Sequence, residues 1–252
     1  MKLIDCFTFF NELELLEMRL HELAPVVDQF VLVESTHTHQ GKPKPLYFDE
    51  NKHLFQRYNI RAVAARPLFK GDSLTESEAW ANESHQRDVM RHLLSQGDLG
   101  LISDVDEIPS REAVDNLTSA PVKFKQRFSY YYLNLITDDV WYGTTAALTD
   151  DIIRLSPQAV CMLRYSPSVP TIESGWHFSY LGGPDRIKQK IEAFAHVEYN
   201  KDEYKDSTHL ENVLAQGVDL FNRETKYRRM DLDDSFPHAV RERPEKYSAL
   251  IC

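Results

Sequence analysis

The stretch 99–109 constrains the fold of this chain more than any other. Its apolar residues end at Ser103. Three carboxylates follow, from Asp104, Asp106 and Glu107, before a proline. An uninterrupted apolar run that ends in polar residues is typical of a strand buried on both faces, as in a parallel sheet covered by helices. Such a strand would place the acids at the edge of the sheet. The alternative is an acidic surface turn, because a bare Asp-x-Asp often occurs by chance.

The segments before this stretch alternate between expected strands and helices. Strands are expected at 4–10, 29–34 and 60–65, and helices at 11–24 and 75–96. Asn11 is expected to cap the first helix, with Glu14 three positions later in a capping box. A strand, a crossover helix and a second buried strand predict a right-handed parallel βαβ unit. The order predicts an open, mostly parallel α/β sheet flanked by helices.

After Pro109 the pattern changes to that of a smaller antiparallel or mixed region. Residues 122–135 alternate between aromatic and basic side chains, which predicts one long strand. Further strands are expected at 159–163 and 175–181, and helices are expected to open at Gly183 and Ser207. Beyond residue 219 the charged, proline-bearing chain is expected to form an extension that packs on the domain.

The charge balance excludes one class of partner. The chain has 39 acidic and 29 basic residues, and a formal net charge of -10 argues against non-specific nucleic-acid binding. Its three cysteines lie far apart without disulfide or zinc spacing, which predicts a reduced, cytoplasmic setting. No apolar stretch is long enough to span a bilayer. We therefore expect a soluble protein, with any contact to the inner membrane peripheral.

The acids after the expected strand predict a ligand. Crowded carboxylates repel one another unless a cation lies among them. Hard oxygen ligands suit Mg²⁺ or Mn²⁺, which complete their shells with water and with the phosphates of a substrate. A metal-bound diphosphate is therefore the expected ligand of Asp104 and Asp106. Glu34 ends the second expected strand and falls at the same edge, where α/β sheets bind ligands.

The chain contains five segments that carry a family resemblance, at 9–23, 30–35, 41–46, 104–109 and 175–179. Together, and in this order, they resemble glycosyltransferase family 17, the family of the enzyme that adds the bisecting N-acetylglucosamine to N-glycans. The resemblance implies a GT-A fold, an inverting transfer, a UDP-sugar donor (most simply UDP-N-acetylglucosamine), Mn²⁺ or Mg²⁺, and a glycan or glycolipid acceptor. It also implies one catalytic domain over 1–218, with a nucleotide-sugar-binding half at 1–109 and an acceptor-side half at 110–218. The extension is then 219–252.

In such an enzyme Asp104 and Asp106 would hold the metal against the donor diphosphate, and His177 would be the third ligand. The alternative for His177 is a core histidine beside aromatic residues. Glu107 is interpreted as a further ligand, an acceptor contact or a partner of Arg111.

Four residues are predicted to contact the donor nucleotide. Glu34 could accept hydrogen bonds from the ribose or uracil, and its alternative is a helix-capping or salt-bridged acid. Trp80 and Arg87 lie on the helix before the acidic strand, and the alternative for Arg87 is a solvated surface arginine. Glu12 lies where the first helix begins, and its alternative is a favourable interaction with the helix dipole.

An inverting transfer needs a general base near the acceptor hydroxyl, and a carboxylate is the usual choice. Glu173 precedes the Gly-Trp-His motif and is the predicted base, with Glu107, Glu192 and Glu198 as rivals. Two other functions stay open: a metal-dependent phosphohydrolase or nucleotidyltransferase, and a non-catalytic nucleotide-sugar-binding protein. Against the first, the chain has no threonine after the acids and no phosphate-binding glycine loop after the first expected strand.

Overall fold

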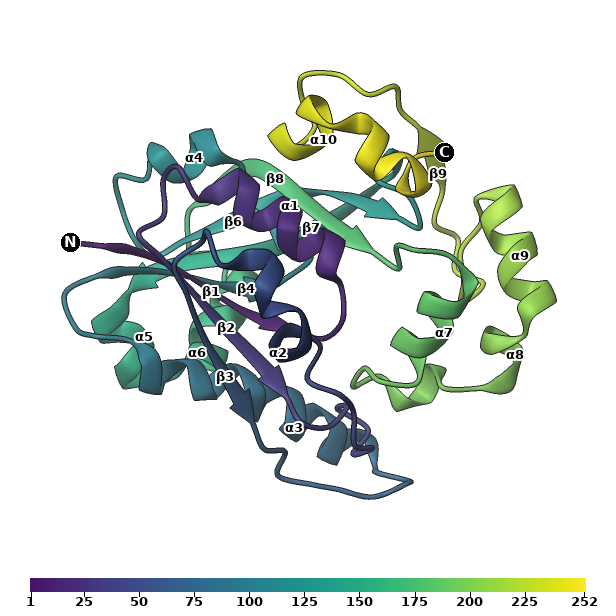
Figure 1. Ribbon diagram of the computed structural model, residues 1–252, viewed down its shortest axis with the longest axis horizontal. Helices are drawn as coiled ribbons and strands as arrows, with labels where there is room; N and C mark the ends of the chain where they lie inside the picture. The colour runs from purple at the N-terminus through teal and green to yellow at the C-terminus, as the bar shows by residue number, and fades with distance from the viewer.

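The computed structural model describes residues 1–252 and contains one continuous nine-stranded sheet with helices on both faces (Figure 1). The strand order is β3-β2-β1-β4-β7-β6-β8-β5, and β9 pairs with β7 outside this path. The strands are β1 (Leu3–Phe9), β2 (Gln29–Ser35), β3 (Ile60–Ala65), β4 (Leu99–Asp104), β5 (Glu107–Ile108), β6 (Val122–Tyr130), β7 (Leu135–Leu148), β8 (Thr171–Ser179) and β9 (Tyr227–Arg229).

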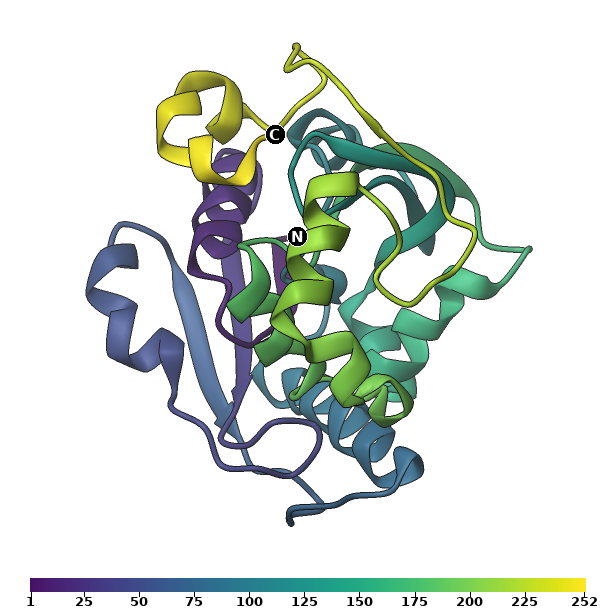
Figure 2. The ribbon, with the colours of Figure 1, turned by 90° about the vertical axis from the view of Figure 1, so that its right-hand side faces the viewer.

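Ten α-helices surround the sheet. Figure 2 shows α7, α8 and α9 as a lobe facing the viewer, on the side of the molecule that lies at the right of Figure 1. The helices are α1 (Leu13–Leu23), α2 (Tyr47–Asn51), α3 (Glu76–Asp88), α4 (Arg111–Asp115), α5 (Thr149–Leu155), α6 (Pro157–Met162), α7 (Pro184–Ile191), α8 (Asp202–Lys205), α9 (Ser207–Gln216) and α10 (His238–Glu242).

The first half of the sheet is parallel. β1 pairs in parallel with β2 and with β4, and β2 pairs in parallel with β3. The predicted α/β class, an open sheet flanked by helices, is confirmed. Because successive side chains of a strand point to opposite faces, the apolar strands bury both faces. α1 and α2 cover one face, and α5, α6 and the end of α3 with its 3₁₀ continuation cover the other.

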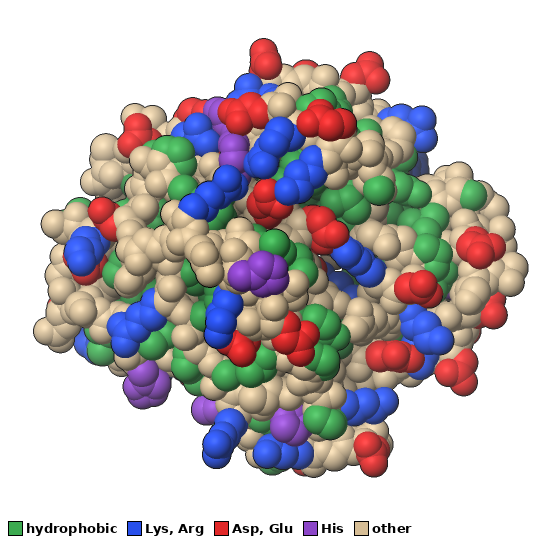
Figure 3. Space-filling view, viewed as in Figure 1, with side chains coloured by type: hydrophobic (Ala, Val, Ile, Leu, Met, Phe, Trp, Pro, Cys, Tyr) green, Lys and Arg blue, Asp and Glu red, His purple; other side chains and the backbone are tan.

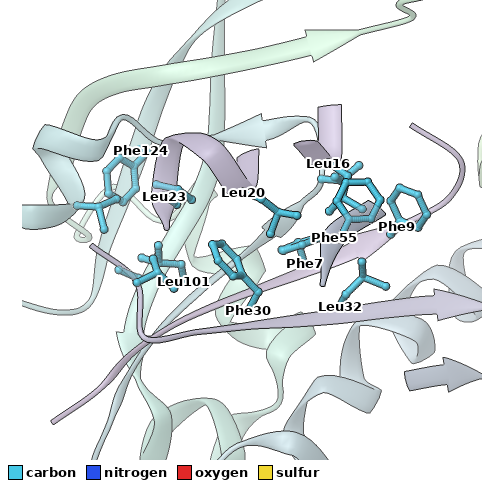
Figure 4. Packing of buried hydrophobic residues seen from close by; sticks show 14 of the residues in the cluster. Phe7, Phe9, Leu16, Leu20, Leu23, Phe30, Leu32, Phe55, Leu101 and Phe124 are labelled. Atoms are coloured by element: carbon cyan, nitrogen blue, oxygen red, sulfur yellow. The ribbon is translucent and has the colours of Figure 1, made fainter. Parts of the chain in front are cut away.

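α1 packs through one stripe of leucines. Leu16, Leu20 and Leu23 lie against Phe7 and Phe30 of the central strands (Figure 4). Their spacing of three and four residues puts them on one side of the helix. This packing fixes the connection between β1 and β2, and therefore the edge at which both strands end.

The mixed half of the sheet differs from the prediction in several places. β8 covers Thr171–Ser179 where a strand was expected at 175–181, and the short strands β5 and β9 were not expected. The expected strand 122–135 ends at Tyr130, because Tyr131 adopts a positive φ of 65° and turns the chain into β7, which the sequence did not reveal. The expected strand at 159–163 is wrong, since residues 159–162 belong to α6 and Leu163 begins the 3₁₀ helix that follows. The Ser156 hydroxyl accepts a hydrogen bond from the Ala159 amide, and Pro157 occupies the first turn, so a helix begins there instead.

The start of α1 also differs from the prediction. Its first residue is Leu13, and the capping position belongs to Glu12, which makes no side-chain capping bond. Asn11 instead donates its side-chain amide to Gln189 Oε1 at 2.7 Å. The turn after β1 is therefore linked to α7, which lies 178 residues away in the sequence.

Residues 219–252 pack against both halves of the molecule. β9 pairs with β7, and α10 packs against α1 through Ala239 and Val240. No helix of the structure combines the length and the hydropathy needed to cross a bilayer.

Candidate active site

The segment 103–107 lies at the carboxyl edge of the parallel strands. β4 ends at Asp104, which is in register with Thr8 at the end of β1. Ligands of open α/β sheets bind outside this edge. The sequence prediction that β4 delivers its acids to a sheet edge is therefore confirmed by the position of Asp104.

Arg19 of α1 holds this segment from behind. Its guanidinium binds Asp5 through two hydrogen bonds of 2.6 and 2.7 Å, and donates to the carbonyl oxygens of Asp104 and Glu107 at 3.0 and 2.8 Å. A fifth bond of 2.6 Å reaches the Ser103 hydroxyl, so all five N–H groups are used. Arg19 and Asp5 are both fully buried. This network fixes the backbone that carries the two aspartates.

Arg19 was not among the predicted site residues, although the sequence holds a signal for it. Arg19 lies three residues after Leu16 and four before Leu23, so it falls on the apolar stripe of the expected helix. A charged residue on a buried stripe needs a buried partner.

Glu107 has a structural role and not the catalytic one predicted from the sequence. Its carboxylate accepts two hydrogen bonds from Arg164, at 2.6 and 3.0 Å, one from Trp141 Nε1 at 2.9 Å and one from the Asp104 amide at 3.0 Å. The residue is fully buried, so no substrate can reach it. Burial opposes the charge on Arg164, but the pairing with Glu107 outweighs this and raises the pKa of the guanidinium.

Asp104 accepts hydrogen bonds through one oxygen only. Oδ1 is 2.5 Å from the Thr8 hydroxyl and 2.7 Å from Arg87 Nη2. Burial alone would raise the pKa of Asp104, but the Arg87 guanidinium outweighs it and holds the value at about 2. Asp104 is therefore ionised at neutral pH. Arg87 is buried in this pair, so it is not the solvated surface arginine of the alternative interpretation.

Asp106 is paired with a lysine that sequence analysis missed. Its Oδ2 lies 2.9 Å from Lys190 Nζ of α7 and 3.7 Å from His177 Nε2. Burial would raise the pKa of Asp106, but the ammonium and the imidazole outweigh it and hold the pKa well below its usual range. Lys190 lies three residues after Ile187 on the apolar side of its helix, which is the signal that could have found it.

The two aspartates fit a divalent cation that also binds substrate phosphates. In each carboxylate one oxygen takes the hydrogen bonds, and Oδ2 of Asp104 and Oδ1 of Asp106 accept none. The predicted third ligand, His177, does not join them, since the structure contains no group of three His, Cys, Asp or Glu side chains arranged for a metal. Mg²⁺-type sites commonly use one or two carboxylates and complete the shell with phosphate and water.

His177 lies in an aromatic stack beside Asp106. Its ring is 4.1 Å from the Trp141 ring and 4.6 Å from the Phe128 ring, and Nδ1 has no hydrogen-bond partner. The stack orients Nε2 toward Asp106. This arrangement fits the alternative interpretation, a core histidine beside aromatic residues.

The other predicted donor contacts fall in different places. Glu12 Oε1 lies 3.9 Å from Lys190 Nζ, close to Asp106. Trp80 packs edge-on against the His196 ring at 4.6 Å, between α3 and the segment after α7. A pocket lined by Glu12 and Lys190 lies between α1 and α7, and Figure 3 shows a hollow between the body of the molecule and the α7–α9 lobe.

Glu34 is a helix-capping acid, the alternative to the predicted nucleotide contact. It accepts hydrogen bonds from the Tyr47 and Phe48 amides at 2.7 and 2.9 Å, at the start of α2. Lys44 Nζ lies 2.7 Å from the same carboxylate. These three donors belong to the protein itself, so the prediction that Glu34 binds the ribose or uracil is wrong.

The predicted general base and its rivals are dispersed. Glu173 is exposed, pairs with Lys125 at 2.9 Å, and lies four residues before His177 along β8, or about 13 Å at about 3.3 Å per residue. Glu192 pairs with Lys205 at 3.4 Å, and Glu198 with His196 at 2.7 Å. Glu173, Glu192 and Glu198 make no hydrogen bond or ion pair with Asp104 or Asp106.

These features define an α/β protein with an ionised acidic site at the carboxyl edge of its parallel strands. The chain belongs to glycosyltransferase family 17, whose family model matches residues 1–232. The predicted family membership is confirmed. The match runs past residue 218, the predicted end of the catalytic domain.

The chain is similar to β-1,4-mannosyl-glycoprotein 4-β-N-acetylglucosaminyltransferase of Homo sapiens, with 25% identity over 253 aligned positions. The alignment covers 84% of this chain and 47% of the human protein, so the chain spans about half the length of the curated relatives it matches.

Two solved structures show a looser likeness. Glucosyl-3-phosphoglycerate synthase from Mycobacterium tuberculosis, in complex with Mn²⁺, UDP-glucose and phosphoglyceric acid, has 13% identity, a TM-score of 0.36, and coverage of 95% of this chain and 91% of that one. S. aureus TarS 1-349 in complex with UDP has 12% identity, a TM-score of 0.40, and coverage of 86% and 70%. The fold is therefore assigned from the strand order and pairing of the sheet described above.

Proposed function

We propose that this chain is a metal-dependent inverting glycosyltransferase that moves N-acetylglucosamine from UDP-N-acetylglucosamine to a glycan or glycolipid. The observation that carries the proposal is the pair Asp104 and Asp106, ionised and each with one unused oxygen, at the ligand-binding edge of a family 17 member. The name of the human relative supports the choice of donor sugar.

Asp104 and Asp106 would hold Mn²⁺ or Mg²⁺ together with the diphosphate of the donor. When bound, the cation would act as a Lewis acid that stabilises the charge developing on the UDP leaving group. Arg87 already binds Asp104 at 2.7 Å and would keep that carboxylate oriented. Arg19 would keep the backbone of both aspartates in place from behind.

Lys190 would exchange partners when the donor binds. Its ammonium lies 2.9 Å from Asp106, where it compensates the carboxylate charge. A cation held by Asp106 would repel it, and the donor would supply phosphate oxygens as a new partner. Lys190 is thus suited to bind the diphosphate, because charge-assisted hydrogen bonds to phosphate are among the strongest in proteins.

The remaining assignments stay proposals. Glu12, which lies near Lys190 and Asp106, would contact the donor. Trp80 packs against His196 and stays a proposed contact of the nucleotide part of the donor. Glu173 stays the predicted general base. Glu12 is an alternative base, because it lies 3.9 Å from Lys190, which contacts Asp106.

The test is release of UDP from a panel of UDP-sugars, with and without Mn²⁺ and without acceptor. Slow hydrolysis of a donor needs no knowledge of the acceptor. We expect UDP release from UDP-N-acetylglucosamine that depends on Mn²⁺ and disappears in Asp106→Ala. Asp202→Ala, at a fully exposed position of α8, is the matched control and should behave like the wild type.

Three outcomes would contradict the proposal. Release of free phosphate would favour a phosphohydrolase. Tight UDP binding without turnover of any sugar, even with acceptor mixtures present, would favour a non-catalytic binding protein. Turnover that persists in Asp106→Ala would show that Asp106 does not hold the cation and the donor diphosphate.

A further inference from the structure

Arg87 divides one of its nitrogens between two carboxylates. Its Nη2 donates to Asp104 Oδ1 at 2.7 Å and to Glu83 Oε1 at 3.3 Å, and its Nη1 donates to Gln158. Burial would lower the pKa of Arg87, but the carboxylates of Asp104 and Glu83 outweigh it and raise the pKa of the guanidinium. The strength with which Arg87 binds Asp104 therefore depends on how strongly Glu83 competes for the same nitrogen.

The second oxygen of Glu83 faces His39, a residue of the segment between β2 and α2. Glu83 Oε2 lies 3.6 Å from His39 Nδ1. The side chains of Glu83 and His39 are only 20% and 23% exposed, so water screens their interaction in part. Glu83 is also the only side chain that forms an ion pair with His39. Glu83 thus connects His39 to Arg87, and Arg87 contacts Asp104.

Gln86 of α3 fixes the tautomer of the neutral His39 ring. Gln86 Nε2 donates to the carbonyl oxygens of Val33 at 2.8 Å and of Phe9 at 3.4 Å, so the amide oxygen is left to face His39. This Oε1 lies 3.0 Å from His39 Nε2, and an amide oxygen can only accept a hydrogen bond. Nε2 therefore carries the hydrogen of the neutral ring, and Nδ1 carries a lone pair.

The backbone of His39 is held from two sides, so the ring stays beside Glu83. The His39 amide donates to the Ala193 carbonyl at 2.9 Å, and Asn82 Nδ2 donates to the His39 carbonyl at 3.0 Å. These hydrogen-bonding neighbours are uncharged. Nδ1 itself is buried and has no hydrogen-bond partner, although such atoms are rare and each needs an explanation.

Proton uptake at Nδ1 would reverse the interaction between His39 and Glu83. In the neutral ring a lone pair faces a carboxylate, and two acceptors repel each other. In the imidazolium, Nδ1 donates, and a charge-assisted hydrogen bond to Glu83 can form. Histidine is the side chain whose charge ordinarily changes between about pH 5 and pH 8. Protonation would draw Glu83 away from Arg87 and leave that guanidinium to Asp104 alone.

We infer that His39 is a positioning residue for the proposed transfer and that it acts through Glu83. When His39 is neutral, Glu83 competes for Arg87. Asp104 then keeps more of its charge for a divalent cation bound with the donor diphosphate. When His39 is protonated, Arg87 pairs more strongly with Asp104 and opposes the cation. The inference rests on the proposed function, and it predicts that Mn²⁺-dependent donor binding weakens as His39 gains its proton.

The experiment measures UDP affinity by calorimetry with Mn²⁺ present, at about pH 8 and about pH 5.5, on either side of the usual histidine range. Titration of the UDP phosphate affects every chain alike, so the variants are compared with the wild type. We expect acidification to weaken binding at least about fivefold more in the wild type than in His39→Gln, the low end of couplings between two sites. His39→Gln can still donate to Gln86 but cannot take up a proton.

Glu83→Gln tests whether His39 acts through Glu83. It should also lose the extra response to pH, although its histidine still titrates. Its affinity should match the acidic wild type, whereas that of His39→Gln should match the wild type at high pH. His92→Gln, at an exposed histidine of the 3₁₀ continuation of α3, is the matched control and should respond to pH as the wild type does.

Ring ¹⁵N NMR of the chain without Mn²⁺ and UDP gives a readout that does not depend on donor binding. We expect the Nε2–H tautomer of His39 at high pH, and a proton on Nδ1 after acidification. Thermal unfolding shows whether each variant is folded, and His39→Gln alone decides the inference if Glu83→Gln is not.

The inference is overturned if the wild type and His39→Gln lose affinity equally on acidification, or if the neutral ring is the Nδ1–H tautomer. It is also overturned if Glu83→Gln keeps the full response to pH, because the His39 charge would then act without Glu83. Any of these results together with Mn²⁺-dependent UDP binding defeats the inference alone. Absence of Mn²⁺-dependent UDP binding at both pH values defeats the proposed function, and the inference with it.

Discussion

Two sets of ion pairs meet at the segment 103–107, and they differ in their access to water. Behind the segment, the pairs Arg19–Asp5 and Arg164–Glu107 are almost fully buried. In front of it, Asp104 is 36% exposed and Lys190 is 24% exposed. The rear pairs use their hydrogen-bonding capacity within the protein, whereas each front carboxylate keeps an unused oxygen. The comparison separates pairs that hold the backbone from pairs that can exchange their partner for a ligand.

The largest expected effect comes from breaking the rear set. Arg19→Met would leave Asp5 charged and unpaired in the interior, and loss of one partner of a buried pair costs about 3–5 kcal/mol. We expect urea unfolding to show a loss of free energy of unfolding in that range. The control Arg154→Met, at a side chain 66% exposed, should stay within about 0.5 kcal/mol. A loss below about 1 kcal/mol in Arg19→Met would mean that the rear set does not hold the segment.

The second effect comes from the front set and concerns binding. Asp106→Ala should remove one of two proposed cation ligands and weaken Mn²⁺-dependent UDP binding by at least about 100-fold, since even indirect partners of a metal cost about 10–100-fold. The melting temperature should fall less than in Arg19→Met, because Lys190 is 24% exposed and water can solvate its ammonium once Asp106 is removed. A large loss of stability with normal UDP affinity would place Asp106 in the rear set.

Lys190→Met should change the affinities for Mn²⁺ and for UDP in opposite directions, and each change should be smaller than that of Asp106→Ala. Without nucleotide, Mn²⁺ should bind more tightly, because no ammonium competes for Asp106. With Mn²⁺ present, UDP should bind about 10-fold more weakly, because one charge-assisted hydrogen bond is lost. Lys188→Met, an exposed neighbour on α7, is the control. If both affinities change in the same direction, the exchange of partners is refuted.

The smallest effect is on stability against acid. The pKa of Asp104 is about 2, below its ordinary value of about 3.9, and the pKa of Asp106 is lowered as well. A carboxylate with a lowered folded-state pKa stabilises the fold above its unfolded value, and this contribution is lost as pH falls. We expect the free energy of unfolding to decline between about pH 4 and pH 2, and less steeply in Asp106→Asn. Equal slopes would show that the front pair adds no stability.

The parallel half of the sheet could be predicted from the sequence because its signals are local. Apolar runs mark β1, β2 and β4, and the leucine stripe of α1 marks the face it buries. β7 was missed, because its middle carries two aspartates and a glycine in place of an apolar run. α6 was assigned as a strand, because a six-residue apolar segment has no period that separates helix from strand.

The candidate site divides in the same way. Asp104, Asp106 and Arg87 follow from one strand and the helix before it. Lys190 and Arg19 contact the segment 103–107 from 84 and 85 residues away in the sequence. No local sequence pattern predicts such distant partners. Glu34 and Glu107 show the converse, since their strand-end positions were visible but their internal partners were not.

The most direct test of the difference between the two sets is calorimetric titration of UDP into the wild-type chain with and without Mn²⁺. If the front carboxylates hold a cation with the donor diphosphate, UDP binds only when Mn²⁺ is present, and Asp104→Asn and Asp106→Asn each abolish the Mn²⁺-dependent part. UDP binding of equal strength with and without Mn²⁺, or none under either condition, would contradict the account.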